Sequence, residues 1–155
     1  MLARTIAAIG LGLGLAGAHQ ASAQGSMAGV WTTQFDIGIR TENGVETSLG
    51  KREARITLAV HGDSVTGTWQ VAAQDGTAPS PVHLNGTRSG NKAELRSEPV
   101  ERTLDMGDGP RPVKMVSVYK FELSGDALAG TSQNVATDGS FDGPERPFAA
   151  TRVKP

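Results

Sequence analysis

Apolar and polar residues alternate along most of this chain, and this period of two is the feature that most constrains its fold. The clearest case is the pair of segments 56–60 and 65–71, which are separated by Gly62 and Asp63. One face of this pair carries the apolar residues Ile56, Leu58, Val60, Val65, Trp69 and Val71. Successive side chains of a strand point to opposite faces, so a strand with one buried face shows this alternation. The two segments therefore predict a β-hairpin with one face in the core.

The same alternation predicts six further strands. In chain order they are 29–39, 82–86, 92–96, 115–123, 128–135 and 147–153. Beyond the N-terminal apolar run, apolar residues at helical spacing with a proper cap are missing from the sequence. We therefore expect an all-β fold of eight strands.

An eight-stranded antiparallel up-and-down barrel is the predicted architecture, with a β-sandwich as the alternative. An open meander leaves two sheet edges unpaired, whereas closure into a barrel removes both. Gly67, Gly86 and Gly130 fall on the inner face of three strands, where a missing side chain lets a strand coil sharply. Residues 74–81 and 98–112 are rich in glycine and proline and predict loops, of which the longer is of a kind that often carries function.

Residues 1–23 match the pattern of a bacterial export signal. A basic residue near the start precedes an apolar run over 6–18, and the small-x-small triplet 21–23 follows. We expect cleavage after Ala23, a single domain over 24–155, and a periplasmic or secreted location. The apolar run is shorter than the ~20 residues that span a bilayer, so membrane insertion is not expected.

Composition argues against several classes of function. The 15 basic and 16 acidic side chains are interspersed, so a basic surface for nucleic acid is not expected. The chain has no cysteine, and no hydroxyl or amine nucleophile stands at a recognisable spacing from a base. His61 and His83 fall on the outward face of their strands and are predicted to be solvated. We therefore expect a protein without enzymatic activity and without a cofactor.

Residues near both ends of the mature chain resemble a family signature. Gly29 and Trp31 form a Gly-x-Trp on the first predicted strand, and Arg152 lies on the last. This resembles the calycin superfamily, the lipocalins and their relatives, in which an arginine of the final strand lies over the tryptophan and closes the barrel floor. The resemblance implies a lipocalin-like barrel and a structural role for the three residues. The Thr-Asp-Tyr loop and the C-terminal helix of lipocalins are absent, so the chain is more similar to compact lipocalin-like domains of bacterial exported proteins.

Trp69, Met115, Tyr119 and Phe121 point inward and are candidates to line a cavity. Eight strands enclose an interior that side chains can fill or that can hold one small ligand, so a packed core is the alternative. The first hypothesis is a non-catalytic binding module that holds a small apolar or amphipathic molecule at the barrel mouth. The second is an interaction scaffold or hydrolase inhibitor that binds another exported protein through the loop over 98–112.

The segment 138–143 has the strongest local resemblance to a metal site. Asp138, Ser140 and Asp142 place oxygen atoms at alternate positions around Gly139, as calcium loops do. The distal bidentate glutamate of such loops is absent, and aspartate and glycine are ordinary turn residues. We interpret the segment as a plain turn, with a calcium site as the alternative.

Overall fold

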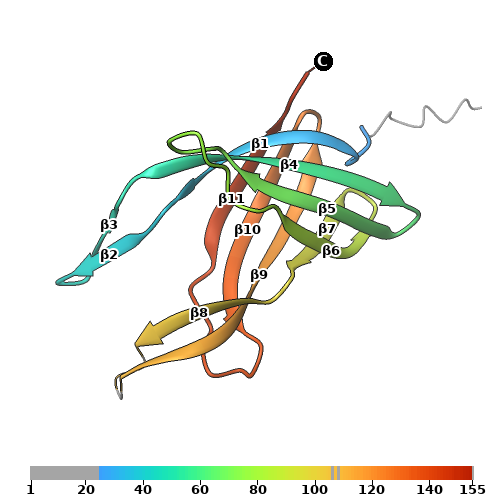
Figure 1. The fold of residues 1–155 in the computed structure, drawn as a ribbon. Coiled ribbons are helices and arrows are strands. Elements are labelled where there is room, and N and C mark those ends of the chain that lie inside the picture. The colour runs from blue at the N-terminus through green and yellow to red at the C-terminus, as the bar shows by residue number, and fades with distance from the viewer. Residues whose placement is uncertain (1–24, 106, 108, 155) are drawn as a thin grey trace, which may run out of the picture.

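The computed structural model describes residues 25–105, 107 and 109–154, which form an all-β fold (Figure 1). The strands are β1 (Gly29–Asp36), β2 (Ile39–Glu42), β3 (Val45–Ser48), β4 (Lys51–His61), β5 (Ser64–Val71), β6 (Val82–Ser89), β7 (Lys92–Ser97), β8 (Val100–Asp105), β9 (Pro110–Ser124), β10 (Ala127–Ala136) and β11 (Arg146–Arg152). The predicted signal peptide, residues 1–23, lies outside the described residues. Within them, no helix is long and apolar enough to cross a membrane.

Eight of these strands close into a barrel. They pair antiparallel in the order β1, β4, β5, β6, β7, β9, β10, β11, and β11 pairs again with β1 through Trp31 and Arg152. Each barrel strand is followed in the ring by the next barrel strand of the sequence. The predicted eight-stranded up-and-down barrel is therefore confirmed, and the sandwich alternative is wrong.

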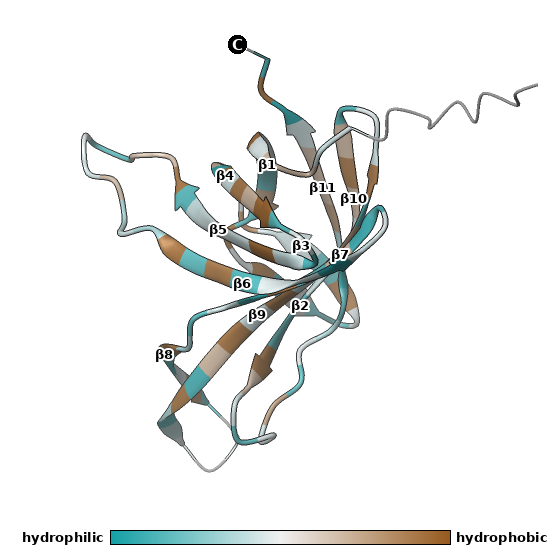
Figure 2. Cartoon of the chain, turned by 90° about the vertical axis from the view of Figure 1, so that its right-hand side faces the viewer, coloured by the Kyte–Doolittle hydropathy of each residue, from teal (hydrophilic) through white to brown (hydrophobic). Residues whose placement is uncertain are grey.

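The core lies inside the barrel and follows the alternation of the strands. Ile56, Leu58, Val65 and Trp69 are buried, as predicted, and Val60 and Val71 pack half-buried against them. In Figure 2 hydrophobic and hydrophilic bands alternate along the same strands. Full burial of one such side chain contributes about 1.5–3 kcal/mol, so this inner face is the main source of stability in a chain without disulfides.

Three glycines allow the barrel to coil tightly. A Cβ atom on Gly86 would collide with the carbonyl of Glu94, and one on Gly130 would collide with the carbonyl of Lys120. A Cβ atom on Gly67 would lie 2.5 Å from the carbonyl oxygen of Thr57. The neighbouring strand thus occupies the space of the missing side chain, as expected for sharply coiled strands.

The two ends of the barrel differ in their connections. At one end, which we call the closed end, two-residue turns join β4 to β5, β6 to β7 and β9 to β10. The N-terminal segment lies at the same end, where Met27 is 1% exposed and Trp31 is fully buried. At the opposite, open end the connections are longer, and one of them is the predicted loop over 74–81, which is confirmed and holds one bridge between Gln74 and Thr77.

Two β-hairpins extend beyond the barrel at the open end, and we call them the first and second arms (Figure 1). The first arm is residues 37–50, in which Asn43 and Gly44 join β2 to β3. The φ angles of these turn residues are 53° and 77°, as a type I′ hairpin turn requires. The first strand of the barrel therefore ends at Asp36, earlier than the predicted end at Ile39.

The alternation of the predicted first strand, 29–39, puts Ile37 on the same face as Trp31, but Ile37 does not reach the core. Ile37 is 54% exposed, because the chain leaves the barrel after Asp36 and has no sheet opposite its inner face there. The backbone nevertheless continues as a hairpin, since the amide of Ile37 donates a hydrogen bond to the carbonyl of Gly50 at 2.9 Å.

The second arm is residues 98–112, and the prediction of a loop there is wrong. β8 pairs antiparallel with the start of β9, from Val100 opposite Met115 to Asp105 opposite Pro110. The prolines of this segment favour a loop in the sequence, yet Pro99 lies before β8, and Pro110 and Pro112 stand at positions of β9 that do not bond to β8. The ladder therefore forms without the N–H groups that proline lacks.

Candidate functional site

The closed end is sealed by a contact between the first and last strands. The guanidinium carbon of Arg152 lies 4.1 Å from the centre of the Trp31 ring, and its Nη1 donates to the carbonyl of Ala28 at 3.0 Å. The indole Nε1 of Trp31 donates to the carbonyl of Met27 at 3.0 Å. Gly29 leaves room for this, because a Cβ atom there would lie 2.9 Å from Nη1. These contacts close the barrel at this end.

Aromatic rings in mutual contact fill the interior toward the open end. Trp69 stacks on Tyr119 with ring centres 5.3 Å apart and planes at 23°. Phe148 contacts Tyr119 at 5.5 Å and Phe121 at 5.7 Å, and Phe35 meets Trp69 edge-on at 5.5 Å. Three of the four predicted lining residues therefore come together, as members of a packed cluster.

Met115, the fourth predicted lining residue, lies apart from the other three. It belongs to a second small core with Val113 and Ala136, against which Leu104 and Phe141 pack. This cluster holds the second arm against the connection between β10 and β11. The face of β9 that points into the barrel thus continues beyond it and supports the arm.

The inner wall is partly exposed at the open end. Phe35, Val71, Val82 and Tyr119 pack against the main core while remaining half-buried. Burial raises the pKa of the Tyr119 phenol, and a hydrogen bond with the Ser117 side chain acts in the opposite direction. The open end therefore presents a shallow apolar wall with one phenol hydroxyl in it.

Two hollows lie on the outside of the barrel. The larger measures about 310 Å³ and is lined by Thr57, Ala59, Thr66, Gly67, Thr68, His83, Leu84 and Asn85. The smaller measures about 260 Å³ and is lined by Asn85, Gly86, Thr87, Glu94 and Arg96. Both hollows are shallow and lined mainly by outward-facing polar side chains. His61 and His83 are exposed.

Among the described residues, most of the large apolar side chains that are exposed lie on the two arms. Large apolar side chains that are exposed are Ile37 at 54%, Val45 at 65%, Leu49 at 55%, Val100 at 37% and Val153 at 37%. The first three lie on the first arm and Val100 lies on the second, whereas Val153 follows the last strand. Single exposed apolar residues are common, but their concentration on two projecting hairpins marks these arms as a candidate interaction surface. Alternation alone does not reveal this surface, but the Asn-Gly turn at 43–44 is a hairpin signal that could have located the first arm.

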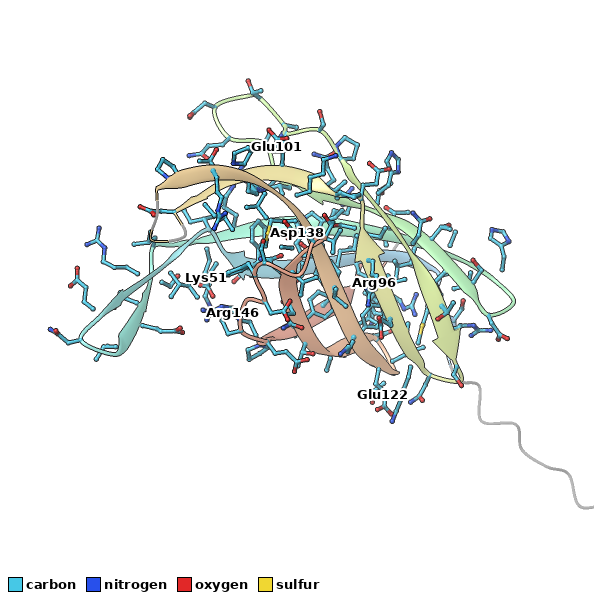
Figure 3. All side chains as sticks on the ribbon, turned by 90° about the horizontal axis from the view of Figure 1, so that it is seen from below. Lys51, Arg96, Glu101, Glu122, Asp138 and Arg146 are labelled. Carbon is cyan, nitrogen blue, oxygen red and sulfur yellow. The ribbon has the colours of Figure 1, made fainter. Side chains whose placement is uncertain are left out.

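An ion pair attaches the first arm to the barrel. The Glu46 carboxylate accepts hydrogen bonds from Nη1 and Nη2 of Arg146 at 3.0 and 3.1 Å (Figure 3 labels Arg146). The hydrogen bonds and charge of Arg146 lower the pKa of Glu46, and the bonds with Glu46 raise the pKa of Arg146. The pair joins residues 100 positions apart in the chain and thereby restricts where the arm can point.

The calcium candidate has its main carboxylate engaged within its own turn. The Asp138 Oδ1 atom accepts hydrogen bonds from the amide of Ser140 at 2.9 Å and from its hydroxyl at 2.6 Å, which lower the pKa of Asp138. Asp142 pairs with Val135 as an isolated β-bridge. Among the residues that the structure describes, no cluster of three or more His, Asp or Glu side chains could hold a metal ion.

A scan against protein-family models and searches of curated proteins and of solved structures find no match to this chain. Its function must therefore be inferred from the residues themselves.

Proposed function

We propose that this chain is a non-catalytic binding module whose two arms hold another exported protein at the open end of the barrel. The observation that carries the proposal is that, within the part of the chain that the structure describes, four of the five large exposed apolar side chains lie on these arms. The arms project from a closed, well-packed frame, and loops or hairpins on such a frame are common sites of recognition. The packed aromatic rings beneath them leave little room for a buried ligand.

A small amphipathic molecule at the open end is the second candidate. The half-buried wall of Phe35, Val71, Val82 and Tyr119 supports it, because such a wall could cover the apolar part of a ligand. Trp69 stacks on Tyr119 and would report such a ligand by a change in its fluorescence.

We also propose that the protein is exported and that its barrel is calycin-like. The export proposal rests on the pattern of residues 1–23. The calycin proposal is supported by the Gly29-x-Trp31 pair lying beneath Arg152, whose guanidinium carbon is 4.1 Å from the indole centre. The export and calycin proposals do not affect the binding proposal, because the binding proposal depends on the arms.

The test of protein binding is site-specific photo-crosslinking. A photoreactive phenylalanine analogue replaces Val45 on the first arm or Val100 on the second, and Asp63 in a turn of the closed end serves as the control. Expressed in the native host, both arm variants are expected to crosslink one and the same exported protein, identified by mass spectrometry, and the control is not. Equal crosslinking from Asp63, or none from the arms, contradicts the proposal.

The test of small-ligand binding uses the purified mature protein. Native mass spectrometry that shows a bound small molecule, together with a change in Trp69 fluorescence on its removal, would favour the second candidate. A bare protein mass that persists after purification without detergent would contradict it.

A further inference from the structure

β8 is an edge strand, because it pairs with β9 and with no other strand of the described residues. The orientation of its outer edge follows from β9. The amide of Leu123 donates to the carbonyl of Asn91, and the amide of Ser117 donates to the Ser97 hydroxyl, both on the β7 side of β9. Backbone groups alternate in direction along a strand, so the odd-numbered residues of β9 bond toward β7 and β8.

The residues of β8 opposite those odd-numbered positions are Val100, Arg102 and Leu104. They use their backbone groups in the ladder with β9. Glu101, Thr103 and Asp105 lie between and beyond them, so they turn their N–H and C=O groups toward the outer edge. These residues offer a ready template for one more strand.

The opposite edge of the second arm is blocked. Even-numbered residues of β9 turn their backbone N–H and C=O groups away from β8; the carbonyl of Lys114, for example, accepts a hydrogen bond from the Thr137 amide on the other side. Pro110 and Pro112 are even-numbered and therefore also face that side. Proline has no N–H and is tolerated at such outward positions of an edge. An added strand can therefore use the β8 side of the arm and finds no regular set of donors on the other.

Acidic side chains outnumber basic ones on β8 itself, while Lys114 of β9 lies directly opposite Glu101. Glu98, Glu101 and Asp105 stand against the single cation Arg102 between residues 98 and 105. Glu101 and Asp105 lie on one face of the strand, and both are exposed (Figure 3 labels Glu101). The other face carries Val100, Arg102 and Leu104, of which Leu104 packs on the small core of the arm.

A second copy of this chain does not fit the edge well. Two copies of β8 would pair antiparallel about a two-fold axis, with the outward-facing residues bonded to one another. Of the two registers with the fullest overlap, one sets Glu101 opposite Asp105 of the second copy, and the other sets Arg102 opposite Arg102. Like charges directly opposite each other destabilise a pair of strands. The edge therefore favours a different chain.

We infer that the outer edge of β8 is a strand-addition site for an extended, basic segment of another protein. This inference rests on the proposed function and names the part of the second arm that makes the contact. The fitting segment pairs antiparallel and places lysine or arginine opposite Glu101 and Asp105. On its other face it carries apolar side chains opposite Val100 and Leu104, which extends the small apolar core of the arm.

The probe for this site is the capped peptide Lys-Val-Thr-Glu-Lys-Val, which has this pattern when it runs antiparallel to β8. In ¹⁵N-labelled mature protein, the amide signals of Glu101, Thr103 and Asp105 are expected to shift most on titration. The charge-reversed peptide Glu-Val-Thr-Lys-Glu-Val is expected to bind about ten-fold more weakly, since the three attractive cross-strand pairs, with Glu101, Arg102 and Asp105, become repulsive. Shifts that map elsewhere, or equal binding of the two peptides, overturn the inference.

Variants of the edge separate backbone pairing from charge. Thr103→Pro removes an outward N–H that β9 does not use and is expected to abolish peptide binding, whereas Thr103→Val retains it. The double variant Glu101→Lys with Asp105→Lys keeps the backbone edge and is expected to prefer the charge-reversed peptide. If Thr103→Pro disturbs the arm, the double variant alone decides, and an unchanged peptide preference overturns the inference.

Failure of strand addition at β8 can be distinguished from failure of the proposed function. If the arms crosslink an exported protein and Thr103→Pro leaves that crosslink intact, strand addition at β8 is wrong and the arms remain the binding surface. If the basic peptide binds at β8 but no exported protein is crosslinked, the edge is receptive and the proposed function is wrong.

Discussion

Trp31 and Arg152 stand directly opposite each other on the first and last strands, and the guanidinium covers the buried indole at 4.1 Å. The same guanidinium contacts Asp126 at 3.2 Å in the turn between β9 and β10. One side chain thus joins the N-terminal segment, the closing strand and a turn, and it stabilises the end of the barrel opposite the arms.

The Arg152→Gln variant is expected to lower the free energy of unfolding by about 2 kcal/mol, since it loses the cation–π contact and the bond to Ala28. Urea unfolding followed by tryptophan fluorescence measures this loss. Arg55→Gln is the matched control, because Arg55 is exposed on the outer face of β4 and should change stability by less than about 0.5 kcal/mol. Equal effects of the two substitutions would show that Arg152 has no special role in closure.

The Tyr119 phenol is expected to titrate above the ordinary pKa of 10.0, because burial raises its pKa. It is the single tyrosine of the chain, so absorbance at the phenolate band reports it without interference. The raised pKa contributes stability that is fully present below the pKa of the unfolded chain and is lost as pH rises through the folded-state pKa. A midpoint at or below the value found in the unfolded chain would be inconsistent with a packed phenol at the open end.

The Glu46→Gln variant is expected to loosen the first arm without unfolding the barrel. Amide hydrogen exchange over residues 39–48 should become faster, while exchange in β5 and β6 stays unchanged. Acidification should have the same effect, because the pKa of Glu46 is lowered by Arg146 and the pair is lost as pH falls through that pKa. Glu42→Gln is the control, since the Glu42 carboxylate pairs with Arg40 within the arm itself. Equal exchange in both variants would exclude a tether role for Glu46.

The Gly130→Ala variant is expected to destabilise the fold by about 3 kcal/mol, because the new Cβ atom would meet the backbone of Lys120 and Phe121. Ala129→Ser, at the exposed neighbouring position, is expected to be nearly neutral. Thermal unfolding followed by circular dichroism compares the two. A Gly130→Ala protein as stable as the parent would mean that β9 and β10 can separate at no cost.

The sequence was sufficient to predict the eight barrel strands because their pattern is local. Each strand has one face in the core, so a period of two is visible without knowledge of its partners. The inward positions of Ile56, Leu58 and Val65 follow directly from it, and the tight turns supply the order of the strands. The closure of the ring could be anticipated from Trp31 and Arg152, which lie on the first and last predicted strands.

The arms could not be predicted in the same way because neither strand pair has a buried face over most of its length. Residues 39–48 hold only Ile39 and Val45 as apolar residues and lack an apolar period, although the Asn-Gly turn between β2 and β3 is a hairpin signal. The prolines of the second arm favour a loop in the sequence. They fit a strand only where the missing N–H faces away from the partner, and whether Pro110 and Pro112 do so depends on the pairing register, which the sequence does not show. The candidate site is therefore largely a property of the three-dimensional structure.

Deletion of the second arm tests the central claim most directly. A variant in which an Asn-Gly turn replaces residues 101–111 should keep the closed barrel, which is checked by its melting temperature and by tryptophan fluorescence. With the photoreactive analogue at Val45, the account predicts that the crosslink to the exported partner is lost or strongly reduced. A folded variant that crosslinks the partner as efficiently as the intact protein would contradict it.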